Sequence, residues 1–158
     1  MPGERKLAGL AEYDAALDEL IANATRTIRI FDKSLGRNFN TPRRYELLGD
    51  FLLASRINRL QIVLHDTSNV GRDCPRLMTL LKRFNHGIAI QQTLAAARNV
   101  YDPFAVADDT RFVRRFHHTN LRGVASIGDV AATRLLIKRF SEIWEASAPS
   151  VAATTIGL

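Results

Sequence analysis

The sequence predicts a single α/β domain with a mixed, mostly parallel sheet and helices on both of its faces. Three observations lead to this prediction. Segments with apolar residues at steps of three and four alternate with short β-branched or fully apolar segments, as in strand–helix–strand units. The length of 158 residues fits one domain. The composition, 46% hydrophobic and 24% charged, is that of a globular protein.

The first part of the chain contains two helix–strand pairs. Apolar residues at helical spacing predict a helix over about 11–24, and the period-two pattern of 27–31 predicts a short strand after it. A Thr-Pro pair at 41–42 is typical of a helix start, because threonine caps free N–H groups and proline loses no hydrogen bond there. The helix runs to about 55. The nearly all-apolar segment 60–64 predicts a central strand covered on both faces.

The middle of the chain predicts a further helix, a strand and a hairpin. The helix covers 75–84, with Asp73 as its cap and Gly87 at its end, and the next strand covers 88–94. Segments 104–107 and 111–115 flank an Asp-Asp-Thr turn, which favours an antiparallel hairpin with a three-residue loop.

The last part of the chain predicts one more strand and a long helix. The strand covers 123–127, and Asp129 can cap a helix with an apolar stripe that ends near Ser147. We expect residues 1–9 to be a flexible N-terminus, 10–148 the domain, and 149–158 a disordered tail.

Composition excludes several classes of protein. No run of 18 apolar residues or secretory signal is present, so we expect a cytoplasmic protein without a membrane partner. The single cysteine, Cys74, excludes an internal disulfide framework and a Cys-rich zinc site. Arginines flank Cys74, which favours a reactive thiol, but a C-x5-R motif is absent and we expect a structural role.

The basic charge indicates polyanion binding. The net charge is +6 and the pI is near 10.1, so nucleic acid is attracted at long range. Only 4 of the 22 basic residues are lysines, and the arginines are scattered along the chain. A solvated basic surface without a specific site is the alternative.

The final third has the order of elements of a known fold. A strand ends at Asp108, a hairpin partner follows, Asn120 lies in a loop, and a short strand leads to a helix with Phe140 and Trp144 in a Phe-x3-Trp pattern. This succession resembles one half of a phospholipase D superfamily fold. The resemblance implies a site assembled from two such halves, and for this chain we expect a homodimer.

The family motif H-x-K-x4-D is incomplete in this chain. Placing Asp108 at the motif aspartate puts Tyr101 at the histidine position and Pro103 at the lysine position. In the family, the histidine attacks phosphorus and the lysine holds the phosphate oxygens. The resemblance therefore implies a degenerate, non-hydrolytic member.

Polar residues follow the predicted parallel strands, where ligands bind in open α/β sheets. Asp32, Lys33, His65 and Asp66 occupy such positions. The alternative is that Asp66 forms a turn and His65 is a half-buried packing residue. The full candidate cleft comprises Asp32, Lys33, His65, Asp66, Tyr101, Asp108, Arg114 and Arg115.

Two functions are compatible with these residues. The first is a non-catalytic binding or regulatory module that holds a phosphate-bearing ligand or nucleic acid. The second is an enzyme that uses His65 or Tyr101 as acid or base beside Asp32, Asp66 or Asp108. We expect no cofactor and no metal. His117 and His118, with Asn120 nearby, suggest a metal site, but adjacent histidines on a strand point to opposite faces and no third ligand has motif spacing.

Overall fold

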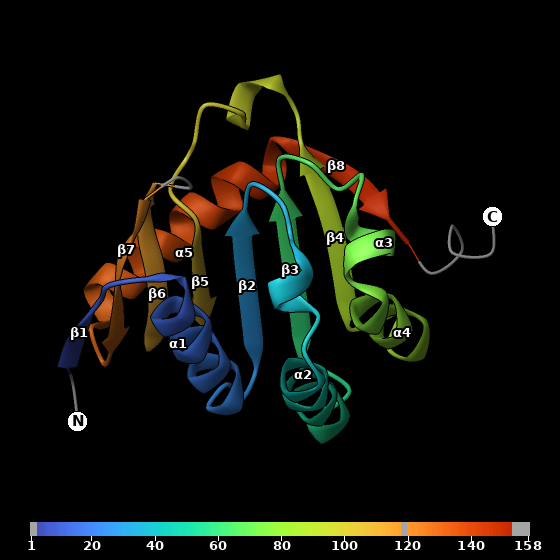
Figure 1. Cartoon of the computed structure of the whole chain (residues 1–158), viewed down its shortest axis with the longest axis horizontal. Coiled ribbons are helices and arrows are strands. Elements are labelled where there is room, and N and C mark those ends of the chain that lie inside the picture. Colours follow the sequence, from blue (N-terminus) through green and yellow to red (C-terminus); the bar gives the residue numbers. More distant parts are fainter. Residues whose placement is uncertain (1–2, 118–119, 153–158) are drawn as a thin grey trace.

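The computed structural model describes residues 3–117 and 120–152, and its described strands form one mixed sheet in the order β1-β7-β6-β5-β2-β3-β4-β8 (Figure 1). The strands are β1 (Gly3–Leu7), β2 (Thr27–Asp32), β3 (Arg59–Leu64), β4 (Ile88–Thr93), β5 (Phe104–Ala107), β6 (Arg111–His117), β7 (Asn120–Ile127) and β8 (Ser147–Val151). β2, β3 and β4 are parallel, whereas the other described pairings are antiparallel. The sheet is therefore mixed, as expected, but mostly antiparallel and not mostly parallel, because the hairpins β5–β6 and β6–β7 and the strands β1 and β8 extend the parallel centre on both sides.

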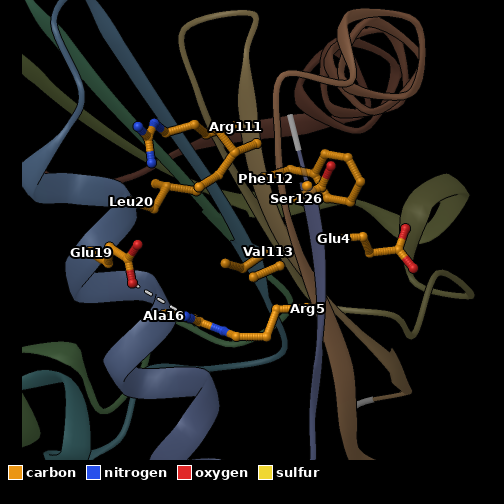
Figure 2. Close-up of a pocket in the computed structure, with 12 residues that line it drawn as sticks. Glu4, Arg5, Ala16, Glu19, Leu20, Arg111, Phe112, Val113 and Ser126 are labelled. Atoms are coloured by element: carbon orange, nitrogen blue, oxygen red, sulfur yellow. Dashed lines mark hydrogen bonds and ion pairs between the residues drawn. The ribbon is translucent and has the colours of Figure 1, made fainter. Parts of the chain in front are cut away.

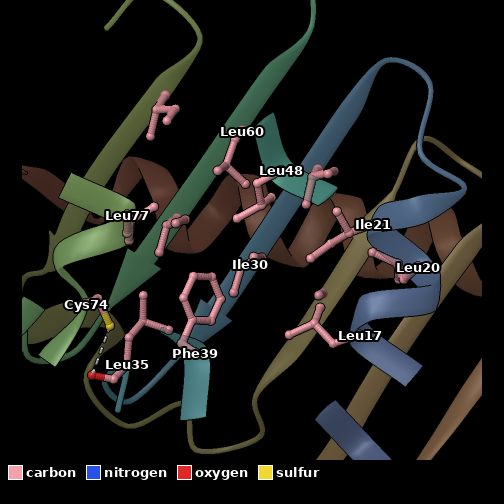
Figure 3. Packing of buried hydrophobic residues seen from close by; sticks show 14 of the residues in the cluster. Leu17, Leu20, Ile21, Ile30, Leu35, Phe39, Leu48, Leu60, Cys74 and Leu77 are labelled. Atoms are coloured by element: carbon pink, nitrogen blue, oxygen red, sulfur yellow. Dashed lines mark hydrogen bonds between the residues drawn. The ribbon is translucent and has the colours of Figure 1, made fainter. Parts of the chain in front are cut away.

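Helices cover both faces of the sheet, as predicted. One face carries α1 (Leu10–Ala22), α2 (Pro42–Ala54), α3 (Val70–Asp73) and α4 (Pro75–Arg83), and the other carries α5 (Val130–Glu145) (Figure 1). Alternation along β2 explains the two layers. Ile30 packs under α1 and α2 (Figure 3), and Ile28 belongs to the same buried cluster, whereas Phe31 packs with Phe140 of α5.

Two predicted helix caps are present and one is absent. The Thr41 side chain accepts a hydrogen bond from the Arg44 N–H at 3.1 Å, and the Asp129 carboxylate accepts one from Ala132 at 3.0 Å. Asp73 does not cap α4. It ends the additional short helix α3, and its carboxylate pairs with Arg72 and Arg37 instead.

The ends of the described chain are strands, which corrects two expectations. Gly3–Leu7 pairs with β7, where a flexible N-terminus was expected. Ser147–Val151 pairs with β4, where the end of the last helix and, from residue 149, a disordered tail were expected. Both cover an edge of the sheet that would otherwise leave backbone groups unpaired. Residues 1–2 and 153–158 lie outside the described residues. The expected loop at Asn120 is also part of a strand, because Asn120 pairs with His117.

Candidate functional site

Several of the candidate residues lie at one edge of the sheet, the edge formed by the ends of its central strands. β2 ends at Asp32 and β3 at Leu64, and both strands run in the same direction. Phe104, the first residue of β5, pairs with Phe31 and with Arg114 near the end of β6. The carboxyl ends of β2, β3 and β6 therefore meet the start of β5 at this edge.

Asp32, Lys33 and Arg115 line one pocket at this edge, on the face covered by α1 and α2. The pocket has a volume of about 270 Å³ and is also lined by Tyr13, Asp14 and Arg44. The Arg115 guanidinium lies over the Tyr13 ring, 5.7 Å from its centroid. The loop after β2 closes the pocket with Leu35, Gly36, Asn38 and Phe39.

The Asp32 carboxyl in this pocket changes charge close to neutral pH. Burial raises its pKa to about 6, although the Lys33 N–H at 2.7 Å and the nearby Arg115 act in the opposite direction. Burial also raises the pKa of Asp14. The pocket therefore becomes more positive as the pH falls through 6.

We expect Asp32→Asn to stabilise the protein at high pH and to have little effect at low pH. A folded-state pKa of about 6, above the ordinary 3.8, means that the ionised form is disfavoured in the folded protein. Each pKa unit corresponds to about 1.4 kcal/mol, so the gain is about 2–3 kcal/mol at pH 8 and below about 1 kcal/mol at pH 4. Urea unfolding at the two pH values measures it. An equal effect at both values would contradict the burial of this charge.

Arg44 is an unpredicted buried charge at the back of the pocket. Its side chain is 1% exposed, and its Nε donates to Asp18 at 2.8 Å while Nη2 donates to the Asp14 carbonyl at 3.0 Å. The guanidinium also lies over the Phe39 ring, 5.0 Å from its centroid. The sequence feature that could have indicated its burial is its position, because Arg44 lies one turn before Leu48 on the apolar stripe of α2.

His65 lies on the opposite face of the sheet from this pocket. Its Nε2 is 2.6 Å from the Val100 carbonyl, which only accepts, so Nε2 carries the proton. Its Nδ1 is 2.7 Å from the Thr93 hydroxyl, and its ring packs edge-on against Phe31 at 5.2 Å. Both nitrogens are engaged, which agrees with the packing alternative for His65.

Tyr101 and Pro103, which the motif comparison of the sequence singled out, make different contacts. Tyr101 is 47% exposed, and its ring lies 5.4 Å from the His117 ring. The Pro103 carbonyl accepts a hydrogen bond from the Arg115 N–H at 2.8 Å. Tyr101 therefore contributes a phenol to this part of the edge, and Pro103 contributes a backbone carbonyl.

Arg114 belongs to a separate ion-pair cluster on the α5 face. Its guanidinium is 3.3 Å from the Asp102 carboxylate, and Arg139 of α5 binds the other oxygen of the same carboxylate. Arg114 and Arg115 thus face opposite sides of β6, as the strand alternation predicts.

Asp108 lies at the opposite edge of the sheet. One carboxylate oxygen accepts hydrogen bonds from the N–H groups of Arg26 and Thr27, and the other accepts from the N–H and hydroxyl of Thr25. Burial favours a raised pKa, but these donors bring the pKa of Asp108 below its usual value. Asp108 is therefore separated from His65 and Tyr101, and these three residues do not converge on one site.

Asp66 forms a turn, as in the alternative considered for it. Its exposed carboxylate accepts a hydrogen bond from the Ser68 N–H at 2.9 Å, and hydrogen bonds from Ser68 lower its pKa. Of the eight candidate residues, the structure brings Asp32, Lys33 and Arg115 together in one pocket. Tyr13, Asp14 and Arg44 complete it and were missed.

Other features carry no candidate chemistry. Cys74 is buried, and burial together with Asp73 raises the pKa of its thiol to about 11, so the thiol is structural. No described group of three His, Cys, Asp or Glu side chains is placed to hold a metal. Within the described residues, every helix is too short or too polar to cross a membrane.

A second pocket lies between β1, α1 and the β6–β7 pair. It has a volume of about 230 Å³, and Val113, Ala125 and Leu20 are among the residues that line it. Figure 2 shows the Arg5–Glu19 ion pair, at 3.5 Å, reaching from β1 to α1. None of the candidate residues lines this second pocket.

The fold is that of phospholipase-D-like proteins. Nuc from Salmonella typhimurium, a phospholipase D family member, matches with a TM-score of 0.69 and 16% identity over 96% of this chain and 100% of that one. NucT from Helicobacter pylori matches with a TM-score of 0.61 and 15% identity over 95% of this chain and 100% of that one.

The archaeal chromatin protein TrmBL2, whose structure shows a mode of DNA binding, matches with a TM-score of 0.67 and 15% identity. The match covers 93% of this chain and 54% of TrmBL2, so the chain spans about half of that protein. No curated protein sequence matches the chain. A family model matches residues 10–154, and the chain belongs to that family, described as a domain of unknown function, DUF7931.

Proposed function

We propose that this protein is a non-catalytic phospholipase-D-like binding domain, and that its pocket at the carboxyl end of β2 holds a phosphate group of nucleic acid. The observation that carries the proposal is the placement of Lys33 and Arg115 in one pocket with Asp32. Lys33 is exposed and Arg115 is buried over the Tyr13 ring, so a phosphate can meet an accessible ammonium and an oriented guanidinium together.

Loss of catalysis is supported by the residues at the edge of the sheet. The motif alignment puts Tyr101 and Pro103 at the catalytic positions, and proline offers no side-chain group to a phosphate. His65 has both ring nitrogens engaged by Thr93 and Val100. We therefore expect no hydrolysis of a phosphodiester such as bis(p-nitrophenyl) phosphate.

Nucleic acid as the ligand is supported by charge and by one structural neighbour. The net charge of +6 attracts a polyanion, and TrmBL2 binds DNA.

The expected homodimer also stays a prediction. Light scattering tests it by comparing the mass in solution with the 17.7 kDa mass of one chain.

Lys33→Ala is expected to weaken binding of a fluorescein-labelled oligonucleotide about three- to tenfold, the effect of losing one charged contact. Fluorescence anisotropy at 50–300 mM salt measures it, with single-stranded and duplex probes. Asp32→Asn should bind more tightly at pH 7.5, because it removes the negative charge from the pocket.

Lys138→Ala is the matched control, since Lys138 is an exposed lysine of α5 on the other face of the sheet. Equal losses from the two lysine variants would show that only overall charge matters and would overturn the proposed pocket. If the protein hydrolyses a phosphodiester and Tyr101→Phe abolishes this activity, the proposed non-catalytic role is overturned.

A further inference from the structure

A separate hollow at the opposite edge of the sheet is lined by three arginines. It lies where α2 and α4 end and β3 and β4 begin, and its volume is about 460 Å³. Arg56, Arg59, Arg83 and His86 line it together with Asn58, and no carboxylate does. It shares no lining residue with the pocket at Lys33 and Arg115.

The three guanidiniums are free of carboxylate partners. None of them forms an ion pair with a described residue. Their side chains are exposed at the rim of the hollow. Clustered like charges repel one another, so this arrangement is more favourable when an anion lies between them.

Two of these arginines are oriented by neighbouring groups. Arg59 donates from Nη1 to the carbonyls of Arg56 and Asn58, at 2.8 and 2.9 Å, which leaves its Nε and Nη2 donors available. Arg83 lies over the Phe84 ring, 4.9 Å from its centroid. Arg56 and Arg83 donate no side-chain hydrogen bond to a described residue, so their forks remain available to a ligand.

Neutralisation of the helix ends does not account for all of this charge. The carboxyl ends of α2 and α4 each carry the equivalent of about half a negative charge. Three arginines exceed this by about two positive charges, which matches a phosphate dianion.

We propose that the hollow between the ends of α2 and α4 is a second anion site, which binds a phosphate group through Arg56, Arg59 and Arg83. The phosphate belongs to a soluble ligand or to a lipid headgroup. Leu53 at the rim is 66% exposed and Ile57 is 54% exposed, so a phospholipid would place its chains against these residues.

The test is a titration with pyrophosphate, followed by amide NMR shifts at matched ionic strength. We expect shifts at Asn58, Asn85 and Gly87, and the double variant Arg56→Gln/Arg83→Gln should weaken binding at least about tenfold, since a charged hydrogen bond is worth about 1.5–3 kcal/mol. Arg43→Gln is the control, because Arg43 is an exposed arginine at the other end of α2.

A second arm identifies the source of the phosphate. The protein is sedimented with phosphatidylglycerol vesicles and, separately, with phosphatidylcholine vesicles. Sedimentation with the first alone, reduced both by Leu53→Ser and by the double variant, would assign the site to lipid headgroups. Pyrophosphate binding unchanged by Leu53→Ser, without sedimentation, would assign it to a soluble ligand. The absence of both, or equal effects of the double variant and Arg43→Gln, would overturn the proposal. Lys33→Ala should leave these shifts unchanged, so the two sites are tested independently.

Discussion

Asp108→Gly is expected to lower the free energy of unfolding by at least about 3 kcal/mol, because hydrogen bonds to a charged group are worth about 1.5–3 kcal/mol each and several are lost together. The carboxylate accepts from three successive N–H groups and from the Thr25 hydroxyl. These bonds join the turn before β2 to the hairpin after β5. Glycine is the appropriate replacement because Asp108 has a φ of 54°, which alanine adopts only with strain.

The neighbouring Asp109 provides the control for this experiment. It is exposed and forms one ion pair with Arg134 at 3.8 Å. Apart from the added backbone flexibility of glycine, Asp109→Gly is therefore expected to lower the free energy of unfolding by less than about 1 kcal/mol. Asp108→Asn should fall between wild type and Asp108→Gly, since the amide keeps one acceptor oxygen. Urea unfolding measures all three. Equal losses for Asp108→Gly and Asp109→Gly would contradict the structural role of this carboxylate.

Arg44→Met is expected to destabilise the fold by about 3–5 kcal/mol, the usual cost of removing one partner from a buried ion pair. Methionine preserves much of the volume but leaves the carboxylates of Asp14 and Asp18 without their cation. The loss should shrink as the pH falls toward 4, because burial raises the pKa of Asp14 and its protonation removes an uncompensated negative charge. Thermal or urea unfolding at pH 7.5 and pH 4 measures both effects.

Arg43→Met is the matched control for Arg44→Met. Arg43 is exposed and lies in the same turn of α2, so its replacement is expected to change the free energy of unfolding by less than about 0.5 kcal/mol. A similarly small effect of Arg44→Met would show that the guanidinium contributes little to joining α1 and α2.

The placement of the candidate residues depended on tertiary structure. Asp32 and His65 both follow parallel strands, but they face opposite sides of the sheet, and only Asp32 enters the pocket with Arg115. Asp108 lies at the far edge because β5 runs antiparallel to β2. The direction and order of strands result from long-range pairing, which a local pattern does not specify.

The sequence by itself determined the α/β class, the positions of the main helices and strands, the Thr41 and Asp129 caps, and the opposite faces of Arg114 and Arg115. These features follow from local periodicity and capping, which neighbouring residues decide. Only the tertiary structure decided that Gly3–Leu7 and Ser147–Val151 are edge strands, that Arg44 is buried against Asp18, and that three arginines meet at the ends of α2 and α4. Each of these depends on segments distant in sequence, since backbone pairing and ion pairing act between whichever groups the fold brings together.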